Sequence, residues 1–142
     1  MKYFLVPPFA LNLSSRRVSA GLLLLRLIIG VAFLQHGYGK ILTPFSWMPP
    51  EAPVPGLAQG LAAFAEFFGG LAVLVGLLTP LASLGLVATM AVAVFFHVMK
   101  GDPFVQGYEL AAVYLTITAS LFLMGPGRYS IDALLNKKNG DI

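Results

Sequence analysis

Residues 24–40, "LLRLIIGVAFLQHGYGK", form a mostly apolar run that contains one arginine, one histidine and one lysine. It belongs to an apolar segment over about 19–41, which as a helix is long enough to cross the hydrocarbon core of a bilayer. Of all residues, 58% are hydrophobic and 11% are charged, with a mean hydropathy of +0.84. These values lie outside the range of soluble domains and predict an integral membrane protein.

Three more segments have a similar length and composition, over about 57–78, 81–100 and 106–124. Each is too long for a strand and lacks the alternation of a barrel strand, so helices are predicted. The turn at Thr79 and Pro80 and the gap over 101–105 are short, which makes neighbouring helices antiparallel. The sequence predicts an all-α transmembrane antiparallel four-helix bundle. We expect one domain over 1–142, with an N-terminal arm over 1–18 and a C-terminal tail over 125–142.

Basic residues predict the orientation of the bundle. Most Lys and Arg lie with the two termini, whereas only Lys40 and Lys100 flank the opposite loops, so both termini are predicted to be cytoplasmic. The net charge of +3 is interpreted as basic residues that set the membrane orientation and contact lipid headgroups. A nucleic-acid partner is not expected, because the sequence has no basic cluster with interleaved aromatic residues. The N-terminal arm is expected to be extended or interfacial, and Ser14 or Ser15 is expected to cap the first helix.

Seven ionisable residues inside or at the ends of the spans are the candidate site residues. A charge that faces lipid costs about 2.5 to 3.5 kcal/mol, so these groups are expected to pair or to line a hydrated pocket. The depth of most of them in the antiparallel helices predicts a polar pocket in the outer half of the bundle, with Arg26 as its floor. The set is Arg26, His36, Lys40, Glu66, His97, Lys100 and Glu109.

Pairing is expected between the three basic residues and the two carboxylates of this set, with the histidines as hydrogen-bonding bridges. Structural alternatives exist for most members. Lys40 and Lys100 suit headgroup anchors, Glu109 suits the N-terminal dipole of its helix, and each histidine suits a satisfied structural role. Arg26 and Glu66 lie far from the helix ends, which favours a functional or core network over a structural ion pair.

The first two spans carry a family resemblance. "RLIIGVAFLQHGYGK" (26–40) and "AEFFGGLAVLVGLLTPLAS" (65–83), supported by His97, Glu109 and "GPGRYSID" (125–132), resemble the DoxX family of small four-helix bacterial membrane proteins. The resemblance extends over about 20–135. It implies a multi-pass protein of the bacterial plasma (inner) membrane, associated with quinone-linked redox chemistry and with soluble or membrane redox partners.

The function expected on this basis is that of a membrane subunit in a quinone-linked oxidoreductase system. His36, Glu66 and His97 are the candidate catalytic residues, for hydrogen bonding to a quinone carbonyl and for proton transfer. The candidate ligand-binding residues are Arg26, Lys40, Lys100 and Glu109. The chain carries no cofactor signature and no cysteine, so the electron donor would belong to a partner. No metal site is predicted, and a homo-oligomer is compatible with the sequence.

Two other functions remain open. His36 and His97 stand at similar depth on different helices, as the axial ligands of a haem b would. Alternatively, the protein has a non-redox role in small-molecule binding, transport or assembly, and its charge network is structural. A transporter is disfavoured, because neither an inverted repeat nor a discontinuous helix is visible in the sequence.

Overall fold

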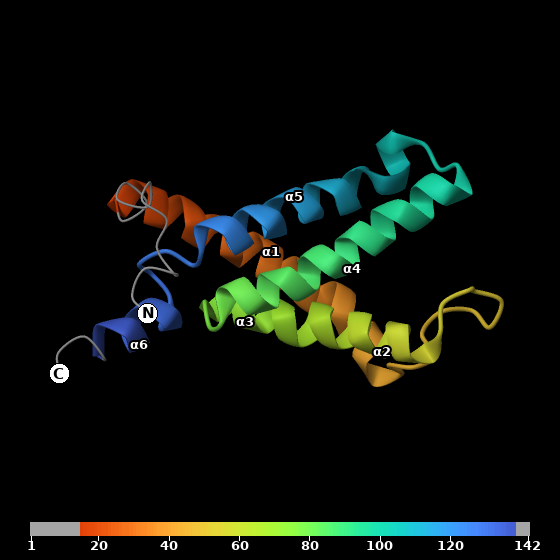
Figure 1. The fold of residues 1–142 in the computed structure, drawn as a ribbon, viewed down its shortest axis with the longest axis horizontal. Coiled ribbons are helices and arrows are strands. Elements are labelled where there is room, and N and C mark those ends of the chain that lie inside the picture. The colour runs from red at the N-terminus through yellow and green to blue at the C-terminus, as the bar shows by residue number, and fades with distance from the viewer. Residues whose placement is uncertain (1–14, 139–142) are drawn as a thin grey trace.

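A computed structural model describes residues 15–138, in which four helical crossings run side by side along the long axis of the molecule (Figure 1). The first is α1 (Arg16–Leu42). The second is α2 (Gly56–Phe64), the π-helical segment η2 (Ala65–Gly69) and α3 (Gly70–Val75) in unbroken succession. The third is α4 (Thr79–Lys100), and the fourth is α5 (Glu109–Met124), preceded by η3 (Phe104–Tyr108). A short helix, α6 (Ile131–Lys138), follows.

All four crossings are long and apolar enough to span a membrane. The predicted all-α four-helix bundle is thereby confirmed, whereas the cytoplasmic placement of the termini stays a prediction. We call the end that carries residues 43–55 and 101–103 the loop end. The opposite end carries residues 76–78 and 125–138, and we call it the tail end.

The turn between the second and third crossings differs from the prediction. Gly76 and Leu78 adopt left-handed backbone conformations, with φ of 74° and 48°, and reverse the chain there. Thr79 and Pro80, predicted to form the turn, are the first two residues of α4. The physical reason is that the fixed φ of proline suits the first turn of a helix, while a glycine suits the left-handed position after one.

The fourth crossing also begins later than predicted. The expected helix over 106–124 starts at Glu109, because Val105 has an extended ψ of 131° and Gln106 a left-handed φ of 66°. Val105 and Gln106 therefore interrupt the helical backbone within η3, at the loop end. Glu109 keeps its predicted position in the first turn of the helix.

At the N-terminal side, the hydroxyl of Ser15 accepts a hydrogen bond from Val18 N at 3.2 Å, so Ser15 is the cap of α1, as expected. Ser14 and the rest of the arm over 1–14 lie outside the described residues. The last three residues of the predicted arm are already helical. The C-terminal tail contains α6, which the sequence analysis did not predict.

Glycines set the close packing of α1 against the second crossing. A Cβ on Gly37 would lie 2.6 Å from Phe67 N, and one on Gly30 would lie 2.7 Å from the Leu74 side chain. Small residues at such positions let membrane helices approach closely. The hydrophobic core is formed by residues of all four crossings: Leu22, Ile29, Phe33, Val73, Leu86, Met90 and Leu121.

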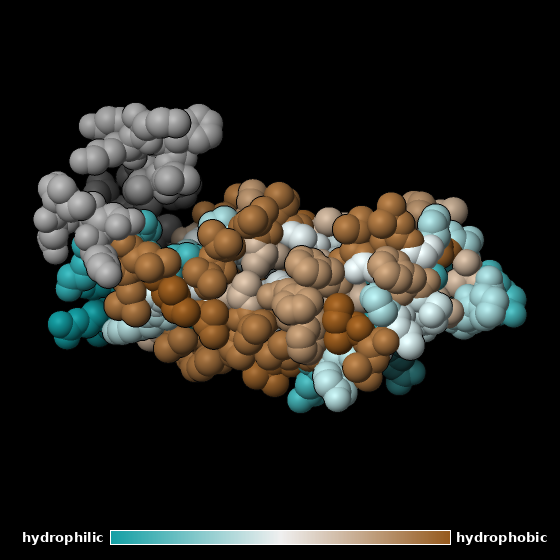
Figure 2. Space-filling model, turned by 90° about the horizontal axis from the view of Figure 1, so that it is seen from below, coloured by the Kyte–Doolittle hydropathy of each residue, from teal (hydrophilic) through white to brown (hydrophobic). Residues whose placement is uncertain are grey.

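The surface has the distribution of a protein embedded in lipid. Figure 2 shows hydrophobic residues over the middle of the visible face and hydrophilic residues mainly toward its two ends. Many large apolar side chains on the outside of the helices are exposed, among them Leu24, Phe95 and Leu123. Such a surface matches a bilayer whose hydrocarbon core the four crossings span.

Candidate ligand-binding site

The centre of the candidate site is an ion pair between the first and second crossings. Lys40 Nζ lies 2.7 Å from each carboxylate oxygen of Glu66. The Glu66 side chain is 2% exposed and that of Lys40 is 25% exposed, so the pair is largely removed from solvent. A buried carboxylate of this kind depends on its partner, because breaking such a pair leaves a charge without compensation.

Local backbone geometry positions both charges. Lys40 occupies the last turn of α1, and Glu66 lies within η2, where the helix widens to π-type turns. Single π-helical turns inside α-helices occur frequently at functional sites. The close approach that Gly37 allows to the backbone of Phe67 brings η2 against α1. The carboxylate of Glu66 therefore meets the end of the lysine chain.

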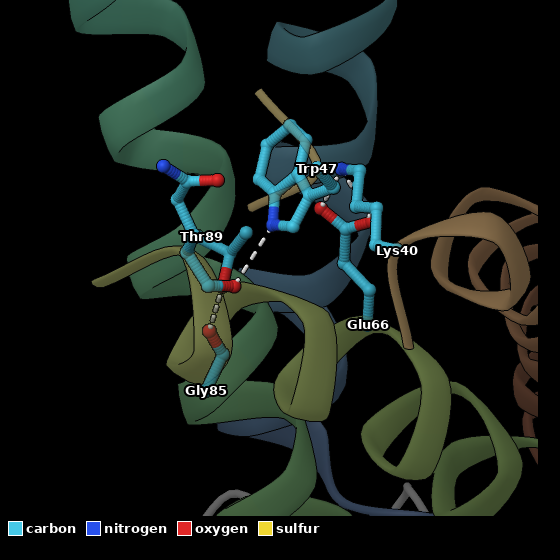
Figure 3. A network of polar contacts seen from close by, with 6 residues as sticks. Lys40, Trp47, Glu66, Gly85 and Thr89 are labelled. Atoms are coloured by element: carbon cyan, nitrogen blue, oxygen red, sulfur yellow. Dashed lines mark hydrogen bonds and ion pairs between the residues drawn. The ribbon is translucent and has the colours of Figure 1, made fainter. Parts of the chain in front are cut away.

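Trp47 lies against this pair from the connection at the loop end. Lys40 Nζ is 4.4 Å from the centroid of the indole ring, a cation–π contact (Figure 3). The indole Nε1 donates a hydrogen bond to Gln59 O at 3.0 Å. The buried amide of Gln59 holds the connection further, since it accepts from Met48 N and donates to Val54 O, each at 3.0 Å. The connection over residues 43–55 is thus folded back over the ion pair.

A second polar pair closes the loop end of α4. His97 Nδ1 lies 2.7 Å from an oxygen of Asp102, just past the glycine that ends the helix. A carboxylate at Nδ1 favours a proton on that nitrogen and leaves Nε2 as the basic atom of the ring. Lys100 Nζ is 4.0 Å from the same carboxylate, and its side chain is 78% exposed. Asp102 was absent from the predicted set, although an acid in the short gap after a helix with a histidine in its last turn is a signal that could have found it.

Two cavities flank these polar pairs. The larger, about 620 Å³, lies between α2 with η2 on one side and α4 on the other, and the connection over 47–54 borders it. Most of its lining is apolar, from residues such as Leu61, Val92 and Phe96, and its ionisable lining residues are Lys40, Glu66 and His97. Binding sites for lipophilic small molecules combine such an apolar wall with a few convergent polar groups, at volumes of about 300–1,000 Å³.

The smaller cavity, about 230 Å³, lies on the α1 and α5 side. Lys40, Glu66, Ala93 and His97 line both cavities, so the Lys40–Glu66 pair and the ring of His97 lie between them. The remaining lining residues are Phe33, His36, Met90, Gly107, Leu110, Ala111 and Tyr114.

The predicted site residues thus fall into three groups. Lys40, Glu66 and His97 are brought together, and His36 lines the smaller cavity, where its ring meets Tyr114 edge-on at 5.9 Å between centroids. Lys100 and Glu109 are exposed at the loop end and line neither cavity. The expected pairing of the basic residues with both carboxylates is realised only between Lys40 and Glu66.

Arg26 is not the floor of this site. Its guanidinium points to the tail end and donates to main-chain carbonyls: Nε to Val73 O at 2.9 Å, Nη2 to Leu74 O at 3.0 Å, and Nη1 to Pro126 O and Tyr129 O at 2.9 and 2.8 Å. The reason for the difference is that the end of α3 and the segment after α5 leave carbonyls without helical partners. We call these four carbonyls with Arg26 the tail-end cage.

Neither a haem nor a metal finds an evident place among residues 15–138. His36 and His97 border the same cavity, but at about 230 Å³ it is smaller than the cavities of about 300–1,000 Å³ that take drug-sized ligands. The haem alternative therefore gains no support from the geometry. Within the same range no three His, Asp or Glu residues are grouped as a metal site would require.

These features define a class: a small multi-pass membrane protein with a cavity-lining ion pair at one end of a four-helix bundle. The model of the DoxX family matches residues 21–99, and the chain belongs to that family. It is 37% identical over 127 residues to the inner membrane protein YqjF of Escherichia coli, covering 83% of this chain and 94% of the relative. It is 32% identical over 120 residues to an uncharacterized protein of Haemophilus influenzae, covering 80% and 90%. The predicted family and inner-membrane localisation are confirmed. No solved structure matches the chain.

Proposed function

We propose that this protein is the membrane subunit of a quinone-linked redox system and that the larger cavity binds the quinone. The observation that carries the proposal is the mostly apolar cavity of about 620 Å³ between α2 with η2 and α4, with Lys40, Glu66 and His97 in its wall. A quinone has the same division of chemistry, since its ring and tail are apolar and its two carbonyl oxygens accept hydrogen bonds.

The polar residues would orient the ring and exchange protons with it. The ammonium of Lys40 is a hydrogen-bond donor suited to a carbonyl oxygen, and so is His97 Nε2 when the ring carries its second proton. A cation at that oxygen stabilises the negative charge that develops on reduction. Conversion to a quinol adds two electrons and two protons. In this proposal the electrons come from a partner protein with a flavin, haem or iron–sulfur centre, and the protons reach the oxygens through His97 and Lys40.

The single tryptophan of the chain offers a direct test of binding. Trp47 lines the larger cavity, so a short-tailed ubiquinone analogue bound there should quench its fluorescence saturably in protein reconstituted into nanodiscs. We expect Glu66→Gln to weaken the binding about tenfold, because loss of the ion pair releases the lysine that orients the ring; tenfold corresponds to about 1.4 kcal/mol. Ala62→Leu, which narrows the cavity, should also weaken it.

Glu109→Gln is the matched control, because it makes the same chemical change at an exposed position that lines neither cavity. Quenching that rises linearly with the quinone content of the lipid, and equally in all variants, would show that the larger cavity does not bind quinone.

A structural role for the ion pair is favoured by one observation. Lys40 already contacts both oxygens of Glu66 and the face of Trp47, which leaves few of its interactions for a ligand. In that case the protein would act as an assembly factor or scaffold in the membrane. Unchanged quenching together with lower thermal stability in Glu66→Gln would favour this function over quinone binding.

A further inference from the structure

The smaller cavity differs in chemistry from the larger one that the proposed function uses. Lys40, Glu66, His36 and His97 all line its volume of about 230 Å³. Four ionisable side chains thus share a space little more than a third the size of the larger cavity. At about 30 Å³ per molecule, this space has room for several waters, and a polar, roomy site of this kind is one that water fills.

The backbone next to this cavity also points to water. Gly107 lines it and directly follows Val105 and Gln106, the two residues of η3 that leave helical geometry. Inside a membrane protein, non-helical backbone is found where it is covered by protein or lines a water-filled cavity, because lipid cannot satisfy its polar groups. Two lining residues, His36 and Leu110, are exposed, so the cavity reaches the surface.

We infer that the smaller cavity is a water-filled vestibule that opens at the loop end and gives an aqueous phase access to Glu66 and His97. The larger cavity, with its mostly apolar wall, stays free of bulk water. The carboxylate of Asp102 holds His97 Nδ1, which leaves Nε2 to exchange a proton with vestibule water. The use of this proton for a bound quinone rests on the proposed function, whereas the hydration of the vestibule does not.

Cysteine accessibility tests the inference cleanly, since the chain contains no cysteine of its own. Ala111→Cys places a thiol in the vestibule, Ala62→Cys one in the larger cavity and Leu24→Cys one on the exposed apolar surface. The probe is a small positively charged methanethiosulfonate, applied to the full-length protein in proteoliposomes and followed by mass spectrometry. Since thiolates form and react where water reaches them, we expect Ala111→Cys to react at least about tenfold faster than the other two variants.

Met90→Cys, at a buried residue that lines the smaller cavity and not the larger one, is a second vestibule variant in case Ala111→Cys fails to fold, which its thermal melt would reveal. If folded vestibule variants react no faster than Leu24→Cys, the cavity holds lipid or is closed, and the inference is wrong. A quinone analogue should slow modification of Ala62→Cys by a neutral maleimide and leave the vestibule variants unaffected. Fast vestibule reaction without this protection would retain the vestibule and count against quinone binding, so the two failures are distinguishable.

Discussion

The two ends of the bundle satisfy buried charges in opposite ways. At the tail end, the 1% exposed Arg26 gives its hydrogen bonds to four main-chain carbonyls. At the loop end, Glu66 is equally buried, but its partner is the side chain of Lys40, and both line cavities. Main-chain partners are fixed by the fold, whereas a side-chain partner beside a cavity can rotate toward a ligand. The first arrangement suits a structural role and the second suits a site.

The largest expected effect is at the tail-end cage. Arg26→Met removes the side-chain donor of four carbonyls, of which Val73 O keeps a bond from Gly76 N at 3.2 Å. At about 1–3 kcal/mol for each of the other three, we expect a loss of about 3 kcal/mol or more in unfolding free energy. The midpoint of thermal unfolding in detergent measures this loss.

Arg26→Lys keeps the charge but lacks the planar fork of donors, so its stability should lie between that of Arg26→Met and the unchanged protein. If Arg26→Met melts normally and instead loses quinone binding, the tail end would be the ligand site, and the ion pair at the loop end would have the structural role.

The ion pair is expected to have a smaller effect on stability, because Lys40 is partly exposed. Glu66→Leu and Lys40→Met should each cost about 2 kcal/mol, since each leaves the other charge without its partner. The double variant should recover most of that loss, because an apolar pair replaces a buried ion pair at little net cost. A double-mutant cycle on thermal unfolding measures the coupling. Costs that simply add would show that the two side chains do not stabilise each other.

The smallest effect concerns the cap that the tail provides for α4. The carboxylate of Asp132 accepts from Leu78 N at 2.8 Å and Thr79 N at 3.0 Å, and Asp132 N donates to Gly76 O at 2.9 Å. Asp132→Ala removes the side-chain bonds and should cost about 1 kcal/mol.

Asp132→Asn keeps an acceptor at the same place and should lose less. Circular-dichroism melts of both variants measure the difference. Equal losses in the two variants would mean that the charge, and not the cap, stabilises the α4 N-terminus.

The sequence was sufficient for the fold because membrane spans depend on length and apolar composition, and both are visible in it. It also put Lys40 and Glu66 among the groups expected to pair, since depth in antiparallel helices follows from residue counts, but it did not say which basic residue pairs with which carboxylate. Arg26 was misplaced because its partners are backbone carbonyls, which every residue possesses and which no side-chain pattern reveals.

Other parts of the site depend on the path of the loops. Trp47 and Asp102 reach the site from connections at the loop end, and their positions follow from turn geometry that composition does not encode. The same holds for α6 and its Asp132, because a tail of mixed polarity gives no indication of where it docks. Charges inside helices were therefore easier to place than polar groups in the loops.

The tail-end cage has a consequence for biosynthesis. Arg26 leaves the ribosome before two of its acceptors, Pro126 and Tyr129, which follow 100 and 103 residues later. Until they arrive, the arginine lacks half of its final partners at a depth where an isolated charge costs about 2.5 to 3.5 kcal/mol. The nascent chain completes this cage only when the segment after α5 has docked, so full stabilisation of Arg26 requires that segment to be made and folded.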